Sequence, residues 1–99
     1  HVPDQACAEY IAHTLVTEKL AACVNISSPV TSIYHWQGQI EHAEEVCLTI
    51  KTSCKGYAAC ETKLQALHPY ELPEIIAINV SEGLPEYLQW IANATVAQE

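Results

Sequence analysis

The sequence predicts an α+β fold in which helices cover one face of a mostly antiparallel sheet. Three observations lead to this fold class. A helical apolar period occupies residues 5–20, a long β-hairpin pattern surrounds the Gln37-Gly38 turn, and a nearly continuous apolar run fills residues 74–80. In chain order these elements fit a split βαββαβ sandwich with an additional C-terminal helix, if one further strand precedes the first helix. That strand is not found within residues 1–99, and we expect it upstream of His1.

The composition indicates one domain with its own hydrophobic core. The chain has 99 residues, 49% of them apolar, and we take residues 1–99 as a single domain. The formal net charge of −8 argues against nucleic-acid binding, because that binding depends on basic side chains that neutralise phosphates. No apolar run reaches the roughly 18 residues that would predict a membrane span.

The five cysteines indicate a reducing environment. Their number is odd, and no pair has the C-x-x-C spacing of a zinc or redox site. Cys7, Cys23 and Cys47 fall inside apolar patterns, where a free thiol behaves as a small hydrophobic group. This usage favours the cytoplasm over an oxidising compartment.

The first helix is predicted to begin after Asp4, whose carboxylate is a good N-cap. Apolar side chains recur along one face of this helix: Ala8, Ile11, Ala12, Leu15, Val16 and Leu20. His13 lies on the opposite, polar side and is expected to be solvated. The chain then passes into a short strand that ends near Ile26.

A long hairpin is predicted from two strands, residues 30–36 and 45–52, joined through the Gln37-Gly38 turn. The alternation of polar and apolar residues is lost at residues 41–44, which predicts a bulge there. Tyr34 and Trp36 lie near the tip, where large aromatic groups cover either the core or a partner. The inward side of the second strand is expected to carry Val46, Leu48 and Ile50.

A second helix with a clean apolar stripe is predicted to end at His68, because Pro69 cannot continue it. Its stripe consists of Tyr57, Cys60, Leu64 and Leu67. The apolar run at residues 74–80 predicts a strand covered on both faces. Pro85 is well placed as the first residue of a third helix, and the polar tail after Asn93 is expected to fray.

The stretch between the second helix and residues 74–80 holds the candidate site. Within seven residues it carries His68, Glu71 and Glu74, and imidazole with carboxylate donors suits copper or zinc. Alternatively, His68 caps the end of the helix and Glu74 pairs with a strand neighbour. No nucleophile beside a base and no glycine-rich phosphate loop is recognisable, so we do not expect an enzyme.

Several segments, in this order and spacing, resemble the CutA divalent-cation tolerance proteins. They are Pro3-Asp4, EKLAACVN at residues 18–25, YHWQG at 34–38, Glu45 with Lys51-Thr52, HPYELPE at 68–74 and YLQW at 87–90. Together they extend through almost the whole chain.

This resemblance implies a ferredoxin-like fold assembled as a tight homotrimer, in which the long hairpins reach across to neighbouring subunits. It also implies tolerance of copper and other divalent ions, with ligands from a cysteine at the end of the first strand and from histidine beside the HPY motif. His68 matches that histidine. Leu67 stands where some members carry a second histidine, and the cysteine position falls before His1.

The sequence therefore predicts a cytoplasmic homotrimer that binds a divalent cation, with Cu²⁺ as the first choice, through His68 and Glu74. A second hypothesis is a trimeric scaffold or small-molecule sensor that uses clefts between its subunits. The acidic composition and the aromatic hairpin tip favour this second hypothesis.

Overall fold

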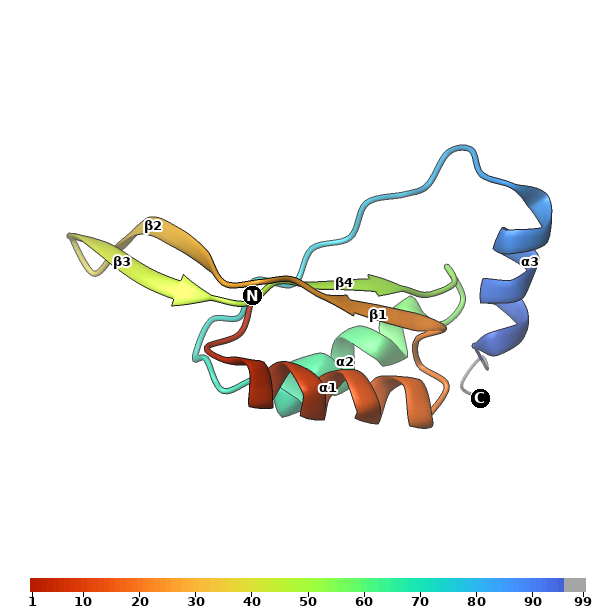
Figure 1. Cartoon of the computed structure of the whole chain (residues 1–99), viewed down its shortest axis with the longest axis horizontal. Helices are drawn as coiled ribbons and strands as arrows, with labels where there is room; N and C mark the ends of the chain where they lie inside the picture. The colour runs from red at the N-terminus through yellow and green to blue at the C-terminus, as the bar shows by residue number, and fades with distance from the viewer. Residues whose placement is uncertain (96–99) are drawn as a thin grey trace.

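The structure, a computed structural model, describes residues 1–95. Its elements are α1 (Gln5–Thr17), β1 (Cys23–Ile26), β2 (Val30–Trp36), β3 (Gln39–Glu45), β4 (Leu48–Lys51), α2 (Tyr57–Leu67) and α3 (Pro85–Ala94). The strands form two antiparallel pairs, β1 with β4 and β2 with β3 (Figure 1). The predicted α+β class is confirmed, including the long hairpin and the additional helix near the C-terminus.

Helix α1 begins where its N-cap was predicted. The backbone N–H of Cys7 donates to the carboxylate of Asp4 at 2.8 Å, which satisfies one of the free amides of the first turn. His13 is exposed, as predicted. Val16 was predicted on the buried face but is 43% exposed, because it lies at the margin of the face centred on Ile11 and Leu15.

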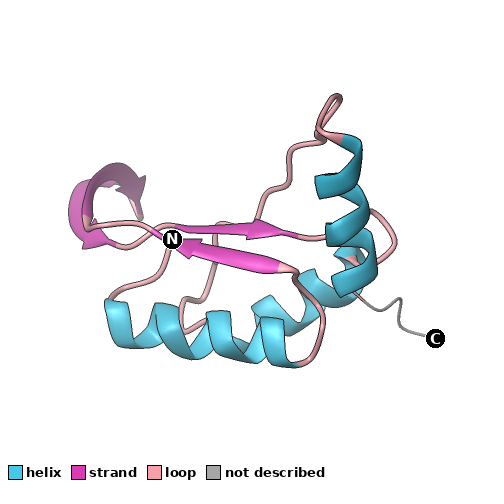
Figure 2. Ribbon diagram, turned by 45° about the vertical axis from the view of Figure 1, so that its right-hand side comes forward, coloured by secondary structure: helices cyan, strands magenta, loops and turns pink. Residues whose placement is uncertain are grey.

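The core lies between the β1–β4 pair and the two helices that cover one side of it, α1 and α2 (Figure 2). Its buried members are Val2, Ala8, Ile11, Leu15, Leu20, Ala21, Val46, Cys60 and Leu64. Leu48 and Ile50 pack against this cluster, so the predicted inward side of the strand is confirmed. The stripe on α2 is confirmed at Cys60, Leu64 and Leu67. Tyr57, by contrast, is half-buried, and its phenol donates to Glu61 outside the core cluster.

The hairpin of β2 and β3 projects from this core and differs from the prediction in one respect. Its register is continuous from Val30 opposite Glu45 to Trp36 opposite Gln39, so the predicted bulge at residues 41–44 is wrong. The pairing changes instead after Glu45, where Val46 bridges to Val2 before β4 begins. The turn is tight because both central residues have positive φ, 49° at Gln37 and 79° at Gly38, which matches the twist of the strands.

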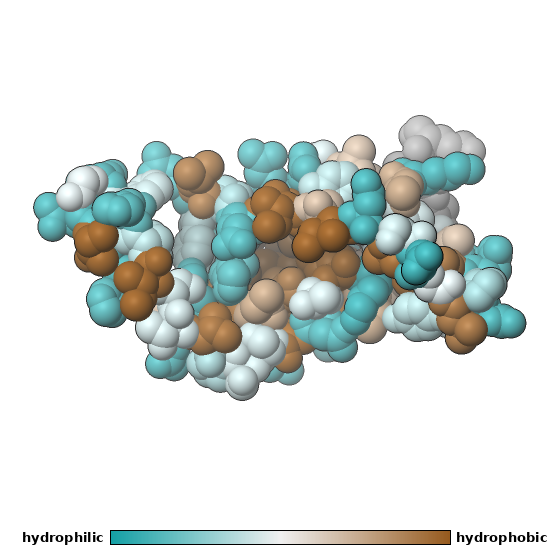
Figure 3. All heavy atoms as spheres, turned by 90° about the horizontal axis from the view of Figure 1, so that it is seen from above, coloured by the Kyte–Doolittle hydropathy of each residue, from teal (hydrophilic) through white to brown (hydrophobic). Residues whose placement is uncertain are grey.

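The strand predicted at residues 74–80 is not formed within residues 1–95, so that prediction is wrong for this structure. Ile76, Ile78 and Val80 are 77%, 88% and 72% exposed. A strand forms only when it pairs with a neighbouring strand. Within the described chain β4 pairs with β1, and no strand pairs with residues 74–80. Apolar side chains are therefore exposed to solvent on the face seen in Figure 3.

Helix α3 begins at Pro85, as predicted. It extends to Ala94, and Thr95 is 8% exposed, so fraying does not begin directly after Asn93. The rest of the predicted polar tail, residues 96–99, lies outside the described residues. Among residues 1–95, the helices are too short or too polar to cross a membrane.

Candidate functional site

The corner after α2 is rigid because the helix cannot pass Pro69. His68 is the last residue to donate into the helix, through its backbone N–H to the carbonyl of Leu64 at 2.9 Å. Its own backbone is already extended, with φ −73° and ψ 133°, as expected for a residue before proline. Residues 68–74 then lead from the end of α2 past the N-terminal residue, because both His68 and Glu74 contact His1.

Both ring nitrogens of His68 are occupied within this corner. The backbone N–H of Tyr70 donates to Nδ1 at 3.1 Å, which leaves the proton on Nε2, and Nε2 lies 2.8 Å from the carbonyl oxygen of His1. Burial lowers the pKa of His68, which favours the neutral ring that this arrangement needs. His68 therefore holds the corner together, and it binds a metal ion only if it releases one of these bonds.

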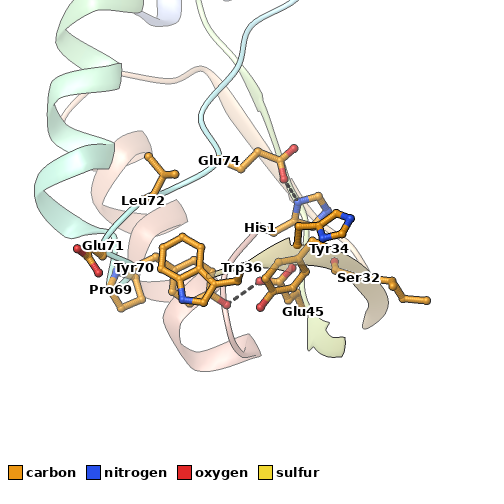
Figure 4. Close-up of a pocket in the computed structure, with 12 residues that line it drawn as sticks. His1, Ser32, Tyr34, Trp36, Glu45, Pro69, Tyr70, Glu71, Leu72 and Glu74 are labelled. Atoms are coloured by element: carbon orange, nitrogen blue, oxygen red, sulfur yellow. Dashed lines mark hydrogen bonds and ion pairs between the residues drawn. The ribbon is translucent and has the colours of Figure 1, made fainter. Parts of the chain in front are cut away.

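Glu74 reaches the same residue from the other end of the corner. Its Oε1 lies 2.8 Å from Nδ1 of His1 (Figure 4). His68 and Glu74 thus both meet His1, although they do not contact each other through a hydrogen bond. Glu71 lines the neighbouring cavity and makes no hydrogen bond among the described residues.

The donor set for a metal ion is consequently small. Within residues 1–95, no three side chains of His, Cys, Asp or Glu cluster closely enough to enclose an ion. The His1–Glu74 pair offers one imidazole nitrogen and one carboxylate oxygen side by side. These donors suit a borderline cation such as Cu²⁺ or Zn²⁺, with water completing its shell. They do not fit a closed structural metal site.

A cavity of about 750 Å³ lies beside this corner. One wall comes from residues 32–36 of β2, and the opposite wall comes from residues 69–72 of the corner. His1, Glu45 and Glu74 complete the lining. Tyr34 and Trp36, the aromatic residues noted near the hairpin tip, are 42% and 38% exposed and face this cavity.

Glu45 is the buried acid of this cavity. It is 8% exposed, and its Oε2 accepts a hydrogen bond of 2.7 Å from the phenol of Tyr70 (Figure 4). Burial, followed by this bond to Glu45, raises the pKa of Tyr70 well above its ordinary value of 10. The phenol therefore remains a hydrogen-bond donor over the whole neutral range.

Sequence reasoning placed the site at residues 68–74 and missed the part that other segments supply. It did not predict that His1 contacts both His68 and Glu74, or that Glu45 enters the cavity. A local signal existed for Glu45 alone, since this charged residue directly precedes the apolar inward positions that begin at Val46. No local signal identifies His1.

Comparisons with known proteins are consistent with this fold along most of the chain. The family model described as "CutA1 divalent ion tolerance protein" matches residues 1–94. A divalent-cation tolerance protein CutA from Thermus thermophilus is 45% identical over 94 residues, which are 95% of this chain and 91% of that protein. Protein CutA from Mus musculus is 42% identical over 93 residues, 94% of this chain, which spans about half (52%) of the mouse protein.

A solved structure agrees at the level of the backbone. The crystal structure of CutA from Xylella fastidiosa has a TM-score of 0.93 and 50% sequence identity to this chain. The match covers 96% of this chain and 91% of that one. Sequence and backbone therefore point to the same family.

Proposed function

Since this chain belongs to the CutA1 divalent ion tolerance protein family, we propose that it binds a divalent cation, Cu²⁺ in the first place, at the corner formed by His1, His68 and Glu74. The observation that carries this proposal is the distance of 2.8 Å between Nδ1 of His1 and Oε1 of Glu74. A cation replaces the proton shared by these two groups, because both are good ligands once deprotonated. His68 fixes the position of His1 through the carbonyl oxygen.

Calorimetric titration with Cu²⁺ tests this assignment. The Glu74→Gln variant is expected to bind about tenfold or more weakly, because it loses an anionic ligand. Glu71→Gln is the matched control, since Glu71 lies in the same stretch without a hydrogen-bond partner among residues 1–95 and its substitution changes the net charge equally. His68→Ala is expected to weaken binding as well.

Each result of this titration is decisive for one residue. Equal affinity of Glu74→Gln and the unmodified protein removes Glu74 from the site, and equal affinity of His68→Ala removes His68. If the unmodified protein shows no saturable binding of Cu²⁺ or Zn²⁺, tolerance in this protein does not act through a cation held at this corner.

We also propose that the chain functions as a homotrimer. The hairpin strands leave their outer edges unpaired within residues 1–95, and they expose Ile33 at 63% and Ile40 at 58%. Such edges and apolar side chains are a liability in a monomer unless another chain covers them. Light scattering is expected to give three times the mass of one chain, and a stable monomer at micromolar concentration contradicts the proposal.

The second candidate function is a trimeric scaffold or small-molecule sensor, and the 750 Å³ cavity favours it. The two functions separate in the presence of a chelator. A scaffold or sensor retains its trimer and its partner in EDTA, whereas a function that depends on the bound cation is lost.

We further propose a cytoplasmic location. All five cysteines are free, as suits a reducing compartment. The CutA protein from Archaeoglobus fulgidus is described as periplasmic, and fractionation of cells that express the present chain distinguishes the two locations. Recovery of this protein from an oxidising compartment would overturn the proposal.

A further inference from the structure

We propose that the cavity between the hairpin and the 69–72 segment binds a protonated organic amine. In this proposal the carboxylate of Glu45 accepts hydrogen bonds from the ammonium group, and the rings of Tyr34, Trp36 and Tyr70 surround its carbon chain. The inference goes beyond the proposed cation function, since the ligand is an organic molecule and the central acid is Glu45.

The charge of the cavity lining favours a cationic ligand. The cavity is lined by Glu45, Glu71 and Glu74, and it has no lysine or arginine among its lining residues. Ion pairs of residues 1–95 join His1 to Glu74 and Lys63 to Glu18, and neither pair involves Glu45. A cation is therefore the complementary charge for the three carboxylates of this lining, and an anionic ligand would meet repulsion from them.

The burial of Glu45 also favours a cationic ligand. A carboxylate that is 8% exposed loses much of its hydration, and the phenol of Tyr70 replaces part of it at Oε2. Within residues 1–95, no lysine, arginine or histidine forms an ion pair with Glu45. An ammonium group in the cavity would supply the balancing positive charge and hydrogen bonds to the other oxygen.

The aromatic rings of the lining favour an organic cation over a metal ion. Tyr34 and Trp36 line the cavity from β2, and Tyr70 lines it from the corner (Figure 4). Ring faces attract ammonium groups and pack well against the attached methylene groups. The carboxylate of Glu45 lies beside the donating phenol of Tyr70. Glu74 instead lies beside a second metal ligand, the imidazole of His1, so the surroundings of Glu45 favour an organic cation.

The size of the cavity fits a small ligand. A volume of about 750 Å³ lies in the range of cavities that hold small molecules. It accommodates a linear diamine with room to extend one end toward the exposed carboxylates of Glu71 and Glu74. A diamine is therefore a suitable probe of this site.

The chain offers an internal reporter for the test. It has two tryptophans, Trp36 in the cavity and Trp90 on α3. In a Trp90→Phe background, fluorescence reports on Trp36 alone. Titration with 1,4-diaminobutane, with EDTA present so that metal ions do not contribute, is expected to give a saturable change. The uncharged analogue 1,4-butanediol is expected to give none.

Two variants locate the amine. Glu45→Gln keeps an acceptor for Tyr70 and removes the charge, and we expect it to raise the Kd at least about tenfold. Glu44→Gln is the matched control, because Glu44 is an exposed neighbour on the same strand and its substitution changes the net charge equally. Binding to a second variant, Trp36→Leu, is measured by calorimetry, because this variant lacks the fluorescent reporter. Its result does not depend on whether Glu45→Gln folds.

The outcomes separate specific binding from general attraction to an acidic protein. Weaker binding by Glu45→Gln and Trp36→Leu, with Glu44→Gln unchanged, supports the proposal. Equal effects of Glu45→Gln and Glu44→Gln mean diffuse surface binding and overturn it. No saturable response to the diamine up to about 10 mM also overturns it, since a Kd above that range is too weak for a built site.

Discussion

Replacing Leu15 with alanine is expected to lower the free energy of unfolding by roughly 2–5 kcal/mol, the largest effect of any substitution considered for this chain. The side chain of Leu15 is 0% exposed and lies in the cluster that joins α1 to α2 and to the β1–β4 pair. Its removal leaves a cavity that Ile11 and Leu64 cannot fill without moving whole elements. Urea denaturation followed by circular dichroism measures the change.

The neighbouring residue provides the control for this experiment. Val16 is 43% exposed and follows Leu15 on the same helix, so Val16→Ala is expected to cost less than about 1 kcal/mol. Both substitutions place alanine, a good helix former, in the last turn of α1. Equal losses in the two variants would mean that the stability of α1 does not depend on the core described here.

The helices were predictable because their signals are local. The N-cap at Asp4 and the proline after His68 act within one turn of the residues whose conformation they fix. The apolar spacing on α1 and α2 likewise identified their buried faces, with Ile11 and Leu64 at the centre. The tertiary contacts of these two helices agree with their local sequence signals.

Strand predictions were less complete, since a strand depends on its neighbours. Residues 74–80 have the composition of a buried strand, yet within residues 1–95 no neighbouring strand pairs with them. The predicted bulge failed for a related reason. Residues 41–44 lose their alternation because both faces of the projecting hairpin meet solvent there, and the ladder opposite residues 31–34 continues without interruption.

Only the part of the candidate site that lies within one segment could be predicted from the sequence. Residues 68–74 were identified from their histidine, acids and prolines. The contacts that define their roles join residues far apart in sequence, as with His1 and Glu74 or Glu45 and Tyr70. Hydrogen bonds of this kind follow from the packing of the hairpin and the corner against one core, which no periodicity encodes.

Substituting Tyr70 with phenylalanine is expected to lower the free energy of unfolding by roughly 1.5–3 kcal/mol at neutral pH, the range for a hydrogen bond to a charged group. The variant keeps the ring in place and removes the phenol that donates to Oε2 of Glu45 at 2.7 Å. The carboxylate then remains buried without that donor. In the Glu45→Gln background the same change is expected to cost less, and the difference between the two losses measures the bond itself.

The same variant gives a distinct result at alkaline pH. Because burial and the bond to Glu45 raise the pKa of Tyr70 in the folded protein, the unfolded chain releases this proton first, at its ordinary pKa of 10. The contribution of Tyr70 to stability is therefore fully present below pH 10 and is lost as pH rises above it, by up to about 1.4 kcal/mol per pH unit. The gap in stability between the unmodified protein and Tyr70→Phe is expected to narrow above pH 10. A gap that stays constant to pH 11 would show that neither burial nor the bond to Glu45 raises the pKa of Tyr70 in the folded protein.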